Sequence, residues 1–110
     1  MMNTEVVITF VRFQDRPGGK VRPALILGTY DPDQPRAAYK ITSQFQTKSL
    51  KIRQYYYEIM DWRGAGLRKA SWIDTGTRLN ADLFTDVRVV GQLQLVDVVG
   101  LEAFLRLPKR

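Results

Sequence analysis

The chain has 110 residues, of which 45% are hydrophobic and 25% charged, and this size and composition predict one globular domain spanning residues 1–110. It has no cysteine, which excludes a disulfide framework and a thiolate zinc site and fits a cytoplasmic protein. Its apolar runs are too short to span a bilayer, and Glu5 stands where a secretory signal would be basic, so we expect neither a membrane segment nor a signal peptide.

The net charge of +6 is unevenly distributed along the chain. Residues 12–53 hold nine basic and three acidic residues, whereas the rest of the chain balances eight against eight. A concentrated positive field attracts polyanions such as RNA, although a solvated basic surface would give the same count. If this cluster binds RNA, affinity should fall by about 0.7 log units per log unit of salt for each phosphate contact.

The first half of the chain reads as short strands joined by turns. The predicted elements are strands at 6–13, 24–28 and 38–44, a turn at 15–20 and a loop at 31–35. In the first strand the apolar phase slips by one residue between Phe10 and Val11, which suggests a β-bulge or a sharply coiled strand. Asp31 and Asp33 could suggest a metal site, but their neighbouring prolines favour a turn, and we expect no bound metal.

The second half adds further strands and one helix. The predicted elements are strands at 52–60, 71–75 and 87–93, a short turn or helix at 62–67 capped by Asp61, and a C-terminal helix capped by Asp97. Val98, Leu101, Phe104 and Leu105 share one face of that helix. The pattern predicts a mostly β fold with a C-terminal helix, as a small curled sheet or barrel.

The candidate chemistry lies where a glycine-rich turn meets an apolar strand. Arg22 could grip a phosphate through its five donors, or could simply end a strand in water. Thr42 and Ser43, at the end of another strand, offer hydroxyls to a phosphate, although threonine is also an ordinary strand residue. Gly18-Gly19-Lys20 could form an anion-binding nest or a plain hairpin turn.

Aromatic residues are embedded in the same basic half. Phe45 and Tyr55-Tyr56-Tyr57 could stack on unpaired bases while neighbouring cations hold the backbone. Three consecutive tyrosines in a strand cannot share one face, so at least one should be buried and one or two exposed. We expect the nucleic-acid-binding residues to be Arg16, Gly19, Lys20, Lys40, Ser43, Gln44, Phe45 and Lys48.

Several segments occur in a characteristic order along the chain. They are residues 11–13, 18–27 and 41–44, then Asp61-Trp62 with 65–67 and 71–73, and finally 89–93 before the last helix. In this order they resemble the MazF/PemK toxins of type II toxin–antitoxin systems. The resemblance covers most of the chain, although the turn before Arg22 is short and Thr4-Glu5 replaces the family's Gly-Asp opening. It implies an SH3-like barrel, a homodimer and metal-independent cleavage of single-stranded RNA without a cofactor, leaving 2′,3′-cyclic phosphate and 5′-OH ends.

The resemblance also assigns roles. Arg22 and Thr42 match the family's residues at the scissile phosphate, and Lys20, Ser43 and Gln44 would make supporting contacts. An acidic, partly disordered antitoxin would compete with RNA for the basic groove. Two other hypotheses stay open: a non-catalytic RNA- or protein-binding barrel, and a toxin like CcdB that inhibits a protein target, although the C-terminal residues 107–110 do not resemble CcdB.

Overall fold

The computed structural model describes residues 4–13, 15–28, 33, 36–109 of the chain. Its elements in order are β1 (Thr4–Arg12), β2 (Gly19–Leu27), β3 (Ala37–Thr42), α1 (Leu50–Arg53), β4 (Tyr56–Glu58), β5 (Trp72–Asn80), the 3-10 helix η1 (Ala81–Leu83), β6 (Thr85–Gln92) and α2 (Leu95–Leu105). Apart from Asp33, the loop predicted at 31–35 lies outside the described residues.

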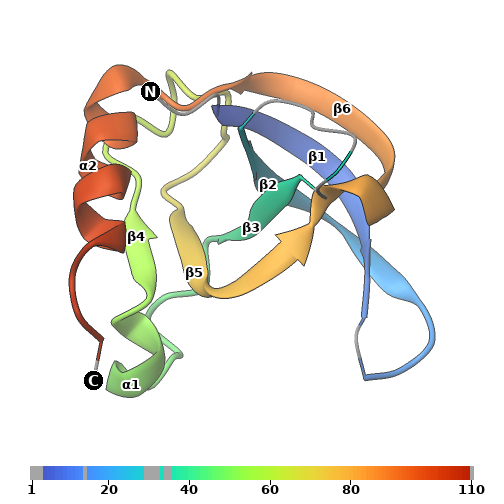
Figure 1. Cartoon of the computed structure of the whole chain (residues 1–110), viewed down its shortest axis with the longest axis horizontal. Coiled ribbons are helices and arrows are strands. Elements are labelled where there is room, and N and C mark those ends of the chain that lie inside the picture. Colours follow the sequence, from blue (N-terminus) through green and yellow to red (C-terminus); the bar gives the residue numbers. More distant parts are fainter. Residues whose placement is uncertain (1–3, 14, 29–32, 34–35, 110) are drawn as a thin grey trace.

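The strands form one sheet of six in the order β4-β5-β3-β2-β1-β6, in which all neighbouring strands are antiparallel. The sheet curls strongly, and β6 arches over β1 while the β1–β2 hairpin stands away from the body (Figure 1). In the described part of the chain, the edge strands β4 and β6 do not pair, so the sheet is open. The predicted mostly β fold with a C-terminal helix is confirmed.

The helix α2 covers one face of the sheet near β4 (Figure 1). Val98 and Leu101 are buried, and they pack with side chains of the sheet in the larger of two apolar clusters. Phe104 lies edge-on to Tyr57, with ring centroids 5.7 Å apart. Because α2 follows directly from β6 and contacts β4, it connects the two open edges of the sheet.

The opposite face of the sheet has its own smaller core. Val7, Ala24, Ile26 and Ala38 alternate with the residues of the larger cluster and pack against Ala81 at the start of η1. Both faces of β1 and β2 are therefore covered over part of their length, which explains the unbroken apolar run at 24–28.

Two sequence-based predictions about the elements were wrong, those for the strand at 52–60 and for the Asp97 cap. The strand predicted at 52–60 is mostly not a strand: α1 and a turn occupy its first half, and β4 has only three residues. The irregularity predicted in the first strand is present in its pairing with β6, where the register shifts at Val6/Val7 and Ile8/Phe10, while the β1–β2 pairing continues regularly through Phe10 and Val11. The extra residues lie on β6, whose bulging lets the edge strand arch.

Asp97 does not cap α2, which begins at Leu95 after Gln94. It is fully buried in the first turn, where Oδ1 accepts hydrogen bonds from the Tyr57 hydroxyl (2.8 Å) and Met60 N–H (2.7 Å) and Oδ2 accepts from Asp61 N–H (2.9 Å). Desolvation raises the pKa of the Tyr57 hydroxyl strongly, and the bond to Asp97 raises it further. A buried carboxylate thus ties α2 to β4 and to the turn that follows.

That turn, at 61–67, forms as predicted with Asp61 at its start. Asp61 Oδ1 accepts from Gly64 N–H at 2.9 Å, and the Asp61 carbonyl accepts from Ala65 N–H at 3.2 Å. Of the three consecutive tyrosines, Tyr56 and Tyr57 are buried and Tyr55 is half-buried. No helix among the described residues is long and apolar enough to cross a membrane.

Candidate functional site

A groove of about 660 Å³ opens on the part of the curled sheet that α2 leaves uncovered. Its floor is apolar and consists of Ile8, Pro23 and Ile41 from three adjacent strands, with Leu67 and Val90 at one side. Ile8 pairs with Pro23 on β2 and with Arg88 on β6, so the floor continues directly into the basic rim. Such a volume lies within the range of about 300–1,000 Å³ that ligand sites occupy.

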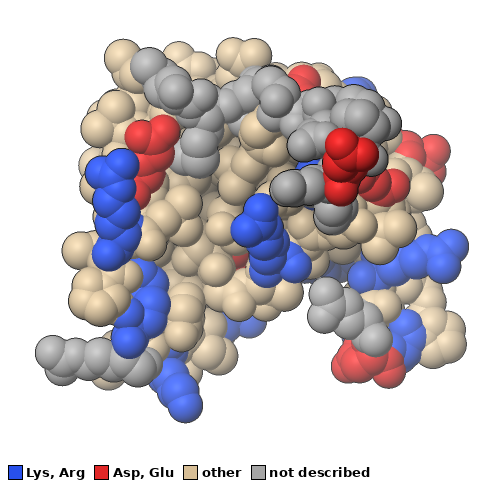
Figure 2. Space-filling view, in the orientation of Figure 1, with Lys and Arg blue, Asp and Glu red and all other residues tan. Residues whose placement is uncertain are grey.

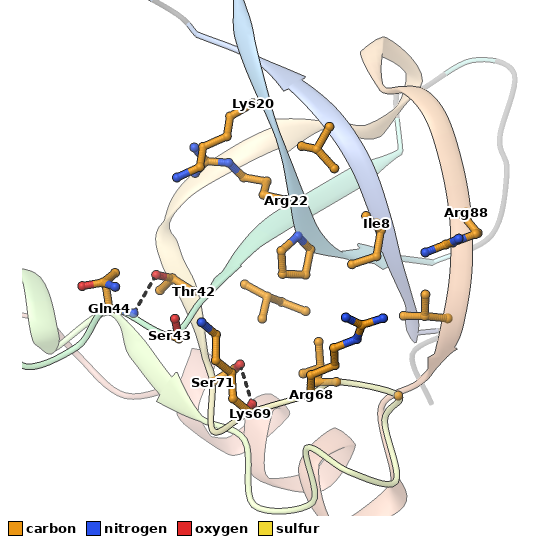
Figure 3. Close-up of a pocket in the computed structure, with 16 residues that line it drawn as sticks. Ile8, Lys20, Arg22, Thr42, Ser43, Gln44, Arg68, Lys69, Ser71 and Arg88 are labelled. Carbon is orange, nitrogen blue, oxygen red and sulfur yellow. Dashed lines mark hydrogen bonds between the residues drawn. The ribbon is translucent and has the colours of Figure 1, made fainter.

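One rim is formed by Lys20 and Arg22 of β2, whose side chains run in the same direction above Thr42 (Figure 3). Ala24 and Lys40 are the last residues that pair between β2 and β3 on the side of the groove. Two residues further along the same register, Arg22 and Thr42 fall opposite each other, where the two strands no longer pair. Arg22 Nε is buried and has no hydrogen-bond partner among the described residues. Burial of an unpartnered donor is costly, and a ligand oxygen would remove that cost.

The second element of this rim is the end of β3. Thr42 Oγ1 accepts a hydrogen bond from Gln44 N–H at 3.0 Å, which fixes the hydroxyl at the turn (Figure 3). The hydroxyl hydrogen of Thr42 stays available as a donor, because a threonine hydroxyl can accept and donate at once. Ser43 and Gln44 line the groove beside it.

The other rim was missed by the sequence analysis. It comes from the segment after the 61–67 turn and from β6, and its polar members are Arg68, Lys69, Ser71 and Arg88 (Figure 3). Ser71 is buried and donates a hydrogen bond to the Lys69 carbonyl at 2.9 Å, which holds the rim segment in place. The sequence analysis did not single out these residues. They lie outside residues 12–53, in the part of the chain where basic and acidic residues are equal in number.

Two glycines bring this rim close to β6. Gly66 has a φ of +91°, and a Cβ there would collide with the Val90 carbonyl; a Cβ on Gly91 would collide with the Ala65 carbonyl. The turn and β6 therefore touch backbone to backbone, which other residues would prevent.

The groove carries a large uncompensated charge. Its lining includes five cationic side chains and no Asp or Glu among the described residues: Lys20, Arg22, Arg68, Lys69 and Arg88. The ion pairs found in the described structure, Arg36–Asp82 and Lys40–Asp74, lie away from the lining of this groove. Clustered cations above an apolar floor suit an anionic ligand with a flat apolar part.

Of the eight expected nucleic-acid-binding residues, three line this groove and five do not. Lys20, Ser43 and Gln44 line it together with Arg22 and Thr42. Arg16 lies on the β1–β2 hairpin with its guanidinium 4.3 Å from the Phe13 ring centroid. Lys40 is 3.9 Å from Asp74 on the neighbouring strand, and Lys48 is half-buried in the turn before α1.

Gly19 and Phe45 have evident structural roles. Gly19 of β2 pairs with Arg12 of β1. A Cβ on Gly19 would lie 2.6 Å from the Phe10 ring, so the position of this ring requires glycine at 19. The Phe45 ring stacks on Trp72, with the ring centroids 4.8 Å apart. The Arg53 guanidinium also lies over the Phe45 ring, 4.8 Å from its centroid. Lys and Arg side chains are scattered over the face of the molecule that Figure 2 shows.

The sequence matches no protein-family model, and no curated protein is significantly similar to it.

Proposed function

We propose that this protein is a metal-independent endoribonuclease of the MazF/PemK type, the toxin of a type II toxin–antitoxin system. The observation that carries the proposal is the buried, unpartnered Nε of Arg22 beside the hydroxyl of Thr42, at one rim of a groove whose charged lining residues are all cationic. Under this proposal the open, curled sheet is a variant of the SH3-like barrel, and the ligand is single-stranded RNA.

The proposed reaction is transesterification within the RNA strand. The ribose 2′-oxygen attacks the adjacent phosphorus and loses its proton to water, the P–O5′ bond breaks, and the departing O5′ takes up a proton from water. The products are a 2′,3′-cyclic phosphate and a 5′-OH end. Arg22 would donate to the non-bridging oxygens as negative charge builds up on them, and Thr42 would donate to the same oxygens or orient the 2′-OH.

Positioning and electrostatic stabilisation would supply most of the rate. The described groove lining contains no His, Asp or Glu, and a guanidinium stays protonated at working pH. Holding the 2′-OH in line with the phosphorus and stabilising the phosphorane need no such base. We further propose that the protein acts as a homodimer and that an acidic antitoxin segment competes with RNA for the five cations.

A second candidate is a non-catalytic RNA-binding protein on the same fold. The specific observation in its favour is the same lining, which has no ordinary general base among the described residues. Both candidates require RNA in the groove, and only the first requires a strand break.

The deciding experiment is incubation of long single-stranded RNA with the protein in EDTA, alongside Arg22→Ala, Thr42→Val and the control Arg78→Ala. Arg78 is an exposed arginine of β5 that does not line the groove. We expect discrete 5′-OH products, a loss of about 10²–10³-fold in kcat for Arg22→Ala, a clear loss for Thr42→Val, and wild-type cleavage for Arg78→Ala. RNA binding without cleavage by the folded wild type would favour the second candidate and refute the first.

A further inference from the structure

Two arginines of the second rim face each other without an acidic residue between them. Arg68 follows the 61–67 turn, Arg88 belongs to β6, and their side chains point toward one another into the groove (Figure 3). Two guanidinium groups that point toward one another repel, and a bound anion would remove that repulsion.

Several other arginines have partners that explain their positions, although exposed arginines such as Arg78 have none within the described structure. Arg36 pairs with Asp82 at 3.1 Å, and Arg53 donates to the Phe45 and Gln46 carbonyls. Arg16 and Arg63 lie over aromatic rings. No hydrogen bond, ion pair or ring contact within the described structure holds the Arg68 or Arg88 guanidinium.

The backbone nevertheless holds this pair together. The glycine contacts between the turn and β6, and the Ser71 bond to the Lys69 carbonyl, fix the two chain segments that carry Arg68 and Arg88. Arg88 of β6 pairs with Ile8 of β1, and Ile8 pairs in turn with Pro23 of β2. The two arginines of the second rim therefore lie across the apolar floor from Arg22. A rigid backbone that holds two unpaired guanidinium groups at one place suits an anion that both can bind.

We propose that Arg68 and Arg88 form a second phosphate-binding site, which holds the RNA backbone at a phosphate other than the one at Arg22. The inference rests on the proposed function only in taking RNA as the ligand, and it requires no cleavage. The apolar floor between the two sites receives the sugar and base of the intervening nucleotide. This arrangement selects an extended single strand, since two phosphates are gripped on opposite sides of an unpaired base.

Binding of an uncleavable oligonucleotide tests the site directly. The probe is a short, fluorescently labelled 2′-O-methyl RNA, in which the attacking hydroxyl is blocked, and its affinity is measured over a range of salt concentrations. We expect the slope of log affinity against log salt to become shallower by about 0.7 in the Arg68→Ala/Arg88→Ala double variant, the value for one lost phosphate contact. Arg78→Ala, which removes one exposed arginine outside the groove, should keep the wild-type slope.

A second binding experiment identifies which phosphate of the RNA each of the two sites binds. Replacing one phosphate at a time by an uncharged methylphosphonate should weaken wild-type binding at two positions, one for each site. The Arg68→Ala/Arg88→Ala variant should have lost its sensitivity at one of them, and Arg22→Ala at the other, as a double-mutant cycle requires. Arg68 and Arg88 are exposed, so the double variant should fold normally, which circular dichroism checks.

Two results would overturn the second site: an unchanged salt slope in the double variant, or the same methylphosphonate profile in wild type and double variant. These outcomes are separate from failure of the nuclease proposal, which the cleavage assay on unmodified RNA decides.

Discussion

The buried carboxylate of Asp97 provides the sharpest prediction about stability. Asp97→Asn keeps the shape of the side chain but changes one acceptor oxygen into a donor. If the amide oxygen keeps the bonds from Tyr57 and Met60, the amide nitrogen faces the N–H of Asp61, whose 2.9 Å bond is lost. An unsatisfied buried N–H costs about 1–3 kcal/mol, and the two remaining bonds lose the strength that a charged acceptor gives them.

The loss is partly offset because a neutral amide avoids the cost of burying a charge. We therefore expect Asp97→Asn to lower the free energy of unfolding by about 2–4 kcal/mol, a large share of the roughly 5–15 kcal/mol available to a domain of this size. The midpoint of thermal unfolding should fall by roughly 10–15 °C. Urea unfolding followed by tryptophan fluorescence measures the difference, since Trp62 lies in the turn that Asp97 holds.

The matched control is Asp86→Asn, which removes the same charge from an exposed site. Asp86 has a φ of +54°, a conformation that asparagine also accepts, so this variant should stay within about 0.5 kcal/mol of wild type. If Asp97→Asn were equally harmless, or if both variants lost the same stability, the assigned hydrogen bonds would not be what stabilises this region.

Two further predictions concern the same region. Because burial and the bond to Asp97 raise the pKa of Tyr57, the folded state keeps this proton longer than the unfolded chain; Tyr57 therefore adds stability below about pH 10 that is lost as pH rises further. Tyr57→Phe should be less stable than wild type by about 1–3 kcal/mol at neutral pH, with a gap that narrows in urea titrations above about pH 10; a gap independent of pH would contradict this. Gly91→Ala should cost about 1–3 kcal/mol and weaken RNA binding, because its Cβ would push against the Ala65 carbonyl and displace the second rim; unchanged stability and binding in calorimetry and titration would show that the rim does not depend on this contact.

Local patterns in the sequence predicted much of the fold. The alternation in 6–13, the turn at Gly18 and the apolar stripe of the last helix each depend on near neighbours, and the structure has a strand, a turn and a helix there, although β2 already begins at Gly19. The strand predicted at 52–60 failed because Tyr and Ile favour strands wherever they occur, whereas Ser49 caps a helical turn by accepting from Ile52 N–H. Asp97 was predicted as a cap because an aspartate before an apolar run usually caps a helix. Its actual partners lie far away in the sequence, and Tyr57, for example, precedes it by 40 residues.

By itself, the sequence determined the mostly β fold, the late helix and the strand end that carries Thr42, because periodicity and turn residues act over a few positions. Arg22, expected where the turn becomes the strand, lies inside β2, which begins at Gly19. Only the tertiary structure decided which charges face the groove. The excess charge lies in residues 12–53, yet Lys40 there is paired with Asp74, while Arg68 and Arg88 come from a region of balanced charge. Folding brings the 61–67 turn against β6 through glycine contacts and places these two arginines in a groove whose described lining has no acidic residue, and no count along the chain contains that information.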